Sequence, residues 1–501
     1  MQAIPDFAGF ARAYAAGRPV LVWTSLVADL ETPVSAMLKL ADGRPNSFLF
    51  ESVEGGAIRG RYSFIGLKPD IIWRCRRNRA EINRNARSDA GAFAPVEEPP
   101  LDSLRRLIAE CRVETPPELP PMAAGLFGYM GYSMVGLIER LPDSKPDTLG
   151  IPDGVFLRPT VVCIFDNIAD RVSVVTPVWP DPRIDARAAY DLARDRLADI
   201  LSDFERNLPH RRESAEAVRE LPAPRPNMTR EQCFAMVETA KEYIRAGEIF
   251  QVVPSMRFTL PFRLPPFALY RALRRLNPSP FLFFLDFGEF SVVGSSPEIL
   301  VRLRDGTVTI RPLAGTRRRG TTAEEDRRLA EELLADPKER AEHLMLLDLA
   351  RNDVGRVAKI GTVRVTEKMV IERYSHVMHI CSHVEGKLDP RYEAMDALAA
   401  GFPAGTLSGA PKVRAMEIID ELEPERRNLY GGAAGYFAGD GSMDTCIVLR
   451  TAIVKDRQMI VQAGVGIVAD SDPATEYQEI LDKSRALFRA AEEAVRFAAG
   501  R

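Results

Sequence analysis

A pair of carboxylates at helical spacing stands in the second half of this chain of 501 residues. Asp336 and Pro337 predict the start of a helix, because Asp is a strong N-cap and Pro is favoured in the first turn. Glu339 and Glu342 then share one helix face. Glu339 could also serve only to close a capping box. The apolar run at 344–347 indicates a helix buried on most sides, which favours a functional role for Glu342.

The same arrangement recurs near the other end of the sequence. Residues 472–473 are again Asp-Pro, and Glu476 and Glu479 follow at the same spacing. Glu479 could instead pair with Lys483 on the next turn. Carboxylate oxygens on rigid elements are ligands for Mg²⁺, and crowded carboxylates also supply acids and bases because like charges raise a pKa. The two pairs predict a divalent-cation site, acid–base chemistry, or both.

The composition describes a globular protein with no polyanion-binding character. It has 67 Lys plus Arg against 70 Asp plus Glu, a formal charge of −3, so no nucleic-acid partner is expected. Hydrophobic residues make up 46% and charged residues 27%, and the length predicts two to four domains. With no secretory pattern and no run near the roughly 18 apolar residues of a membrane span, we expect a cytoplasmic protein without a membrane partner. The six Cys are widely spaced and are expected to be free thiols.

A polar, Pro-rich stretch at 209–227 predicts a boundary between two parts, 1–220 and 226–501. The first part is predicted to be strand-rich. The second opens with a capping box formed by Thr229 and Gln232. Long strand-like runs between helices favour an α+β fold over a doubly wound sheet. The elements expected are strands at 20–23, 48–53, 70–74, 249–259 and 290–303, a hairpin at 158–178, and helices at 185–204, 322–350, 389–400, 410–422 and 473–497.

Several segments are rich in Gly and small polar residues, which lets backbone N–H groups approach an anion closely. In order along the chain, these and other strings resemble one family, the chorismate-utilising enzymes, and within it the large subunits of anthranilate synthase. GRYSFIG (60–66) and GLFGYMGYSMV (125–135) extend the resemblance into the first part. The other matching strings include GEIFQVVPS (247–255), NPSPFLFFL (277–285), GSSPEIL (294–300), RPLAGTRRRG (311–320), EHLMLLDLARNDVGRV (342–357), ERYSHVMHICSHVEG (372–386), GTLSGAPKVRAMEIID (405–420), GGAAGYF (431–437), DTCIVLR (444–450), QAGVGIVADSDP (462–473) and EYQEILDKSRAL (476–487).

The resemblance implies a Mg²⁺-dependent lyase that makes anthranilate and pyruvate from chorismate and ammonia, the first step of tryptophan biosynthesis. Glu342 and Glu479 are implied to hold the Mg²⁺ that binds the ring carboxylate of chorismate. Glu339 and Glu476 are implied to lie beside them, where they support the metal ligands or act as acid–base partners. His379 matches the family's active-site histidine near the ring hydroxyl.

Further positions are implied to hold the substrate. Arg450 is suited to the enolpyruvyl carboxylate, because its planar guanidinium binds carboxylates through two parallel hydrogen bonds. Tyr436 and the amides around Gly464 and Gly466 are implied to assist it. Thr406 matches an active-site threonine of the family, and a turn or a helix cap explains it equally well.

Two positions separate the chemistries within the family. Isochorismate and salicylate synthases carry a Lys that activates water where this chain has Gln251, and a neutral amide cannot act as that base. Aminodeoxychorismate synthases carry a nucleophilic Lys where this chain has Ala314, followed by Gly315 and Thr316. The nucleophile implied is therefore ammonia, with a separate glutaminase subunit (component II) as the partner that supplies it.

A feedback site for tryptophan is implied by two segments that lie far apart in the chain. Glu51 is implied to face the amino group and Ser52 to support it. As plain structure, Glu51 is a surface residue and the Asn-Pro-Ser-Pro run is a turn. Many family members have Tyr-Met at 281–282, so the pocket of this chain is expected to be more apolar. The second segment consists of Asn277, Pro278, Ser279, Pro280, Phe281 and Leu282.

The fold implied is α+β, with two orthogonally packed β-sheets and surrounding helices. Residues 1–220 are expected to form the regulatory, tryptophan-binding part and residues 226–501 the chorismate-binding, catalytic part. Two alternative functions stay open: component I of aminodeoxychorismate synthase, and a catalytically dead tryptophan-sensing scaffold. The scaffold is disfavoured by the presence of the implied site residues Glu342, His379, Arg450 and Glu479.

Overall fold

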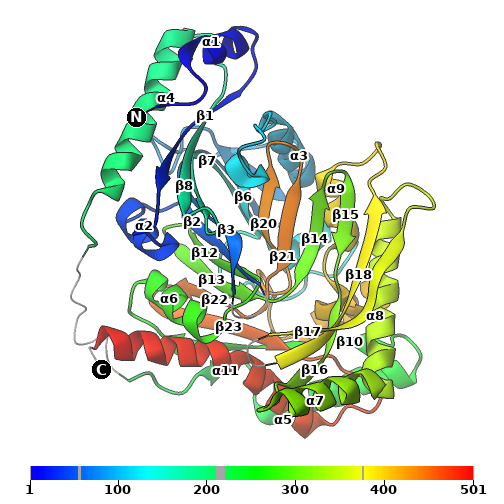
Figure 1. Ribbon diagram of the computed structural model, residues 1–501. Helices are drawn as coiled ribbons and strands as arrows, with labels where there is room; N and C mark the ends of the chain where they lie inside the picture. The colour runs from blue at the N-terminus through cyan, green and yellow to red at the C-terminus, as the bar shows by residue number, and fades with distance from the viewer. Residues whose placement is uncertain (1, 55–57, 210–219, 375–376, 500–501) are drawn as a thin grey trace.

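The computed structural model describes residues 2–54, 58–209, 220–374 and 377–499, which form two large antiparallel sheets with helices outside them (Figure 1). One network of ladders joins 21 strands, and it divides into two sheets at the long strands β3 (Ile58–Arg76) and β7 (Gly154–Asp166). The first sheet also contains β1 (Val20–Val27), β2 (Ser47–Glu54), β8 (Arg171–Val178), β9 (Arg225–Pro226), β11 (Ser255–Pro261), β12 (Phe281–Asp286), β13 (Phe290–Ser296), β22 (Thr451–Lys455) and β23 (Gln458–Gly464). The second also contains β4 (Arg79–Asn83), β5 (Ala94–Pro95), β6 (Gly125–Met130), β14 (Ile299–Arg304), β15 (Thr307–Ile310), β16 (Leu313–Arg318), β17 (Arg364–Arg373), β18 (Val377–Lys387), β20 (Ala433–Ala438) and β21 (Met443–Ile447).

The strand β3 passes from one sheet to the other at a local irregularity. Lys68 has a φ of 52°, and the ladder between β3 and β7 shifts register between Pro69 and Ile71. Proline has no N–H for a ladder, and a bulge bends a strand and increases its twist. The first half of β3 therefore pairs with β2, whereas the second half pairs with β4. Figure 1 shows β20 and β21 crossing the direction of β22 and β23.

Three apolar layers hold the sheets and helices together. Phe48, Phe64, Phe127 and Phe283 lie in the layer between the sheets. A second layer lies under α1 (Phe7–Ala15), α2 (Pro33–Leu40), α4 (Ala186–Phe204), α6 (Pro266–Leu276) and α11 (Pro473–Ala498). A third lies under α3 (Pro100–Glu110), α5 (Arg230–Arg245), α8 (Pro337–Gly355), α9 (Ala394–Gly401) and α10 (Lys412–Leu422).

The remaining helix, α7 (Ala323–Ala335), packs on β16, β17 and β18. Three short 3₁₀ turns in the described residues are η1 (Pro121–Ala123), η2 (Tyr132–Leu137) and η3 (Gly405–Leu407). The expected α+β class is confirmed.

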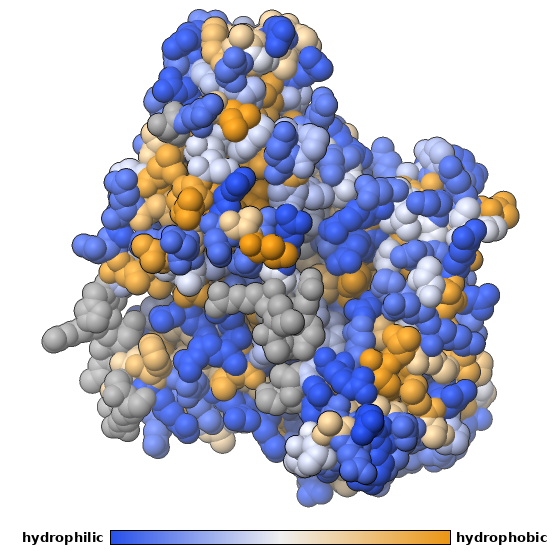
Figure 2. Space-filling view, viewed as in Figure 1, coloured by the Kyte–Doolittle hydropathy of each residue, from blue (hydrophilic) through white to orange (hydrophobic). Residues whose placement is uncertain are grey.

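The surface view mixes hydrophilic and hydrophobic residues over one face of the molecule (Figure 2). Within the described residues, none of the helices combines the length and the apolar character needed to cross a membrane.

The predicted helix starts are confirmed by their hydrogen bonds. The Asp336 side chain accepts from the N–H groups of Lys338 and Glu339 at the start of α8. The Asp472 side chain accepts from the N–H of Thr475 at the start of α11. These caps are local interactions, which explains why the sequence places both helix starts correctly.

The helical span expected at 322–350 consists of two helices, which divide at the start predicted from Asp336 and Pro337, because proline disfavours the α region for the residue before it. Two predicted strands are wrong in their continuity. The strand expected over 249–259 is divided between β10 (Gln251–Val252) in a small separate sheet and β11 in the first large sheet. The strand expected over 290–303 is interrupted at Pro297, which divides β13 from β14. The residue after this proline, Glu298, turns toward the cavity described below.

The predicted boundary at 209–227 lies partly outside the described residues. Strands from its two sides pair directly, since β2 pairs with β12 and β6 with β20. The division into parts 1–220 and 226–501 stays a prediction.

Candidate active site

A cavity of about 1100 Å³ lies where the first turns of α8 and α11 meet β16 and β18. The segment after β23 and the loop between β21 and β22 complete its wall. A small two-stranded sheet of β10 (Gln251–Val252) and β19 (Gly409–Ala410) carries Gln251 to this wall. The residues expected from the sequence that line the cavity are Gln251, Ala314, Gly315, Thr316, Glu339, Glu342, His379, Thr406, Arg450, Gly464, Gly466, Glu476 and Glu479.

The carboxylate pair on α8 is tied to neighbouring side chains. The Gln251 side-chain amide donates to Glu342 Oε1 at 3.1 Å. Burial raises the pKa of Glu342, and the negative charges of Glu339 and Glu479 raise it further against the lowering effect of Gln251. Arg317 Nη1 donates to Glu339 Oε1 at 3.1 Å. Because Glu479 on α11 raises the pKa of Glu342 on α8, the two helices bring their negative charges into one region.

The carboxylate pair on α11 is divided between a buried and an exposed residue. Glu476 is buried, and its pKa is raised, chiefly by burial and also by the charge of Glu479, while a hydrogen bond from Ser471 opposes the shift. Glu479 is exposed and forms the predicted ion pair with Lys483, with 2.8 Å between Oε1 and Nζ. Lys483 Nζ also donates to the carbonyl of Gly464 at 3.1 Å.

Within the described ranges, no group of three or more His, Cys, Asp or Glu side chains is drawn together in a metal-binding arrangement. In this structure Glu479 is paired with Lys483, and Glu342 accepts a hydrogen bond from Gln251. The donor set nevertheless fits a hard cation, since four carboxylates of the cavity wall lie within electrostatic reach.

His379 is held in one tautomer by the strand opposite. Its Nδ1 lies 3.0 Å from the carbonyl oxygen of Gly315 and 3.1 Å from the hydroxyl of Thr316. A carbonyl can only accept, so Nδ1 carries the proton in the neutral ring and Nε2 is free to accept one. Burial lowers the pKa of His379 to about 4, and the charge of Arg450 adds to this effect. His379 is therefore neutral at pH 7.

Arg450 has the character of an unused anion-binding group. It has a φ of 47° and stands between β21 and β22, and none of the described residues accepts a hydrogen bond from its guanidinium. Burial lowers its pKa, while the neighbouring Tyr374 and Glu298 raise it. A partly buried guanidinium without a hydrogen-bonded acceptor among the described residues favours an anionic ligand beside it.

Glu298 is a cavity residue that the sequence analysis missed. It is 6% exposed, and burial raises its pKa to about 8 against the hydrogen bonds from Leu313 and Thr406. The Thr406 hydroxyl lies 3.4 Å from each Glu298 carboxylate oxygen, at the long end of hydrogen-bond geometry. The signal for it is the Ser-Pro-Glu run within GSSPEIL, because the proline interrupts the predicted strand and leaves a carboxylate directly before the apolar run at 299–301.

The expectation for Tyr436 is corrected by the structure. Its ring lies in the layer between the sheets, 5.6 Å between centroids from both Phe64 and Phe127, and does not line the cavity. Alternation along β20 directs this side chain into that layer. The cavity is lined instead by Tyr430, which precedes the glycine run that drew attention to Tyr436.

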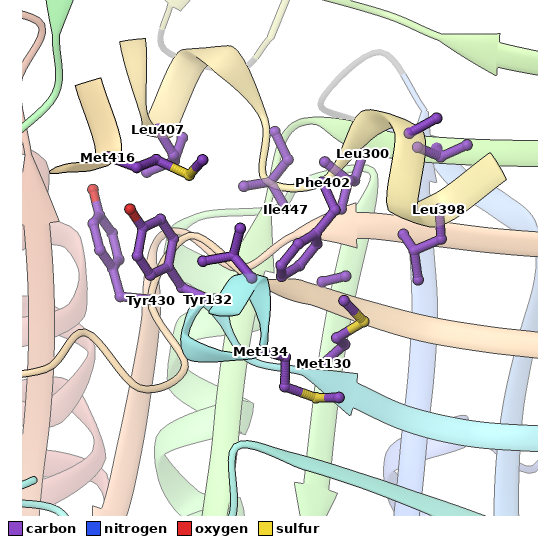
Figure 3. Packing of buried hydrophobic residues seen from close by; sticks show 14 of the residues in the cluster. Met130, Tyr132, Met134, Leu300, Leu398, Phe402, Leu407, Met416, Tyr430 and Ile447 are labelled. Atoms are coloured by element: carbon purple, nitrogen blue, oxygen red, sulfur yellow. The ribbon is translucent and has the colours of Figure 1, made fainter. Parts of the chain in front are cut away.

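Tyr430 belongs both to the cavity wall and to the core behind it. Figure 3 shows its ring beside that of Tyr132, with Leu407 and Met416 above them. Leu407 adjoins Thr406 in η3 and also lines the cavity. This packing fixes the wall on which Thr406 stands.

Two glycines are required by close approaches in the wall. A Cβ on Gly464 would lie 2.7 Å from the carbonyl oxygen of Pro254 and 3.0 Å from the Tyr430 hydroxyl. A Cβ on Gly466 would lie 2.5 Å from the Gln251 amide nitrogen. Glycine at 466 therefore makes room for Gln251, whose amide oxygen is buried without a hydrogen-bond partner among the described residues.

The positions implied for tryptophan are distributed over two regions. Asn277, Pro278 and Ser279 line the large cavity. Glu51 stands opposite Leu282 in the β2–β12 ladder and is buried, so it is not the surface residue considered as an alternative. Phe281 packs on the layer between the sheets and Leu282 in the layer under α6, while Ser52 lies at a register shift of β2 and Pro280 precedes β12.

The chain is similar along most of its length to one family of enzymes. The family model described as chorismate binding enzyme matches residues 68–489. The chain is 60% identical over 493 residues to anthranilate synthase component 1 of Cereibacter sphaeroides, covering 98% of each chain. It is 50% identical to anthranilate synthase component 1 of Pseudomonas aeruginosa, covering 93% of this chain and 94% of the other.

Solved structures show the same likeness. Anthranilate synthase component I from Streptococcus pneumoniae matches with a TM-score of 0.76 at 37% identity, covering 85% of this chain and 92% of the other. The menaquinone-specific isochorismate synthase from Escherichia coli matches with a TM-score of 0.70 at 20% identity, covering 97% and 98%, which shows a common fold.

Proposed function

Because the chain belongs to the family of chorismate-binding enzymes and to its anthranilate synthase component 1 members, we propose that it converts chorismate and ammonia into anthranilate, pyruvate and water. The observation that carries the proposal is a single cavity that gathers Arg450, His379 and the carboxylates of two distant helices. The same cavity has Gln251 and Ala314 at the positions where the resemblance places lysines in enzymes that use other nucleophiles.

Charge balance supports a Mg²⁺ cofactor in this proposal. Apart from Glu298, which carries its proton at pH 7, the acidic residues of the cavity wall are Glu339, Glu342, Glu476, Glu479 and Asp482, against the basic residues Arg450, Lys338 and Lys483. Chorismate is a dianion, so a wall with more acids than bases repels it unless a cation is added. Glu342 and Glu479 would hold Mg²⁺, which supplies a positive charge for the ring carboxylate and polarises the ring. Arg450 would then bind the enolpyruvyl carboxylate.

The departing ring hydroxyl needs a proton donor. Glu298, with a pKa of about 8, carries its proton at pH 7 and can give it up within the cavity. His379 is neutral, and its Nε2 is available to accept a proton when the ring becomes aromatic. Glu339 and Glu476, which also line the cavity, are the other carboxylates proposed for acid–base work, and Thr406 is proposed to contact Glu298 through its hydroxyl.

Ammonia is the nucleophile in this proposal, and a glutaminase subunit supplies it from glutamine. The neutral amide of Gln251 does not compete as a base, and Ala314 offers no nucleophile of its own. The names of the relatives, which are component 1 proteins, support a separate partner. Feedback inhibition by tryptophan belongs to the same proposal and rests on Glu51 and on the segment 277–282.

The test is incubation of the protein with chorismate, Mg²⁺ and an ammonium salt. Anthranilate fluorescence and pyruvate should appear together, with no lyase added. Accumulation of 4-amino-4-deoxychorismate would replace this assignment by aminodeoxychorismate synthase. Tryptophan binding without any turnover of chorismate would replace it by a sensing scaffold.

A further inference from the structure

The carboxylate of Glu51, to which the proposed feedback site assigns an amino group, already holds a cation. Arg274 Nε donates to Glu51 Oε1 at 2.6 Å and Arg274 Nη2 to Oε2 at 2.8 Å. The Tyr270 hydroxyl donates to Oε1 at 2.7 Å. The Glu51 side chain is 3% exposed and that of Arg274 is 17% exposed. An effector with an ammonium group therefore meets an occupied carboxylate, not a free one.

We propose that Arg274 couples the feedback site to the chorismate cavity, because an ammonium-bearing effector at Glu51 takes the place of the Arg274 guanidinium. The proposal rests on the tryptophan site of the proposed function and adds the means by which that site acts. Arg274 and Tyr270 both stand on α6, so loss of the Arg274 contact loosens the last turn of that helix from β2.

The contacts of Glu51 decide between replacement and simultaneous binding. Both carboxylate oxygens already accept hydrogen bonds, Oε1 from Arg274 and Tyr270 and Oε2 from Arg274. Because the Glu51 side chain is only 3% exposed, an ammonium group has no open approach to it while Arg274 stays in place. Arg274 stands at the edge of the buried region and can reach solvent, whereas Glu51 cannot. Replacement is therefore the less costly outcome.

The last turn of α6 leads directly into the cavity wall. Asn277 caps α6 with its N–H on the Leu273 carbonyl at 2.8 Å, one turn beyond Arg274. The Asn277 side chain donates to Ser295 Oγ at 3.2 Å, and the Ser295 hydroxyl donates to the Asn277 carbonyl at 2.5 Å. The Ser295 N–H donates to the carbonyl of Arg450 at 3.2 Å. A shift of this turn therefore reaches the backbone of Arg450, whose guanidinium is assigned to the substrate.

The experiment compares tryptophan binding with tryptophan inhibition in Arg274→Met. Binding of L-tryptophan to the full chain is measured by calorimetry, and inhibition of ammonia-dependent anthranilate formation is expressed relative to each variant's own uninhibited rate. Without its competitor, Arg274→Met should bind tryptophan about tenfold more tightly. It should nevertheless lose most of the inhibition, because no contact is broken on binding. Chorismate should weaken tryptophan binding in the wild type but not in the variant, since coupling is reciprocal.

Two further variants complete the test. Tyr270→Phe removes a neutral hydrogen bond to the same carboxylate and should keep the inhibition. Arg274→Lys keeps the charge with fewer hydrogen bonds and should show tighter tryptophan binding with partial inhibition. If Arg274→Met does not fold, Arg274→Lys alone tests the proposal. Weaker or unchanged binding with full inhibition in the Arg274 variants overturns the proposal. A wild type that forms anthranilate but does not bind tryptophan also overturns it, whereas a wild type that forms no anthranilate overturns the proposed function instead.

Discussion

Replacing Glu298 with glutamine tests whether the proton of this buried carboxyl group takes part in the reaction. The variant keeps the shape of the side chain and, at pH 7, its neutral state, so the cavity should change little. General acid catalysis contributes about 10²- to 10⁴-fold to a rate, and we expect kcat to fall within that range while KM for chorismate stays within a few-fold. The matched control is Asp444→Asn, since Asp444 is half-buried with a raised pKa but lies outside the cavity wall.

The stability of the same variant provides an independent check. Burial raises the pKa of Glu298 from 4.5 to about 8, so between these pH values the folded chain holds a proton that the unfolded chain has lost. The free energy of unfolding of the wild type therefore falls as the pH rises from 4.5 to 8 and is constant with respect to this group above 8. The full change corresponds to about 5 kcal/mol. The E298Q variant lacks this change.

The measurement is denaturant unfolding of wild type and E298Q at several pH values, together with steady-state anthranilate formation. The stability of E298Q relative to wild type should increase through the window from 4.5 to 8. A difference that is independent of pH would show that Glu298 ionises normally. A kcat of E298Q close to that of the wild type would remove Glu298 as the acid, whatever the stability curves show.

Three more predictions address the cavity. Tyr430→Phe should raise KM for chorismate by about 10-fold, as for a lost hydrogen bond to a charged group, whereas Tyr436→Phe should leave steady-state kinetics unchanged; equal effects would contradict the reassignment. Arg450→Lys should raise KM by about 10- to 100-fold because lysine cannot form two parallel hydrogen bonds, and a KM near that of the wild type would place the carboxylate elsewhere. Glu479→Gln should raise the Mg²⁺ concentration needed for half-maximal rate, while Asp482→Asn should not. Removal of divalent cations with a chelator should abolish the activity of the wild type. Full activity after chelation would exclude the metal.

The fold could be predicted from the sequence wherever its cause is local. The starts of α8 and α11 follow from an Asp-Pro pair, and the capping box at 229–232 forms as predicted at the start of α5. The passage of β3 and β7 through both sheets could not be predicted, because pairing partners lie far away in the chain and alternation does not identify them. The interruption at Pro297 could have been predicted, since proline is poorly tolerated inside a central strand.

The candidate site shows a similar division. The resemblance placed residues such as Gln251 and Glu342 in one site, and the structure brings them to 3.1 Å between side-chain nitrogen and oxygen. Tyr436 and Tyr430 are six residues apart, and the sequence alone does not distinguish them. Tyr436 lies in β20 and faces the layer between the sheets, whereas Tyr430 precedes that strand and lines the cavity. The importance of Glu298 depends on its burial, which no local pattern determines.

The contacts that the cavity carboxylates make in this structure are weak enough to break when a cation binds. Glu479 and Lys483 are 47% and 45% exposed in their side chains, and an ion pair so open to water contributes little to stability. Glu479 can therefore leave Lys483 at low cost, whereas Glu342 keeps the Gln251 amide on Oε1 and offers its other oxygen. Lys483 remains beside Gly464, where its ammonium adds a positive charge to the wall that would receive the proposed dianionic substrate. In the proposed function, this exposed ion pair would thus supply a metal ligand and a cation that faces the substrate.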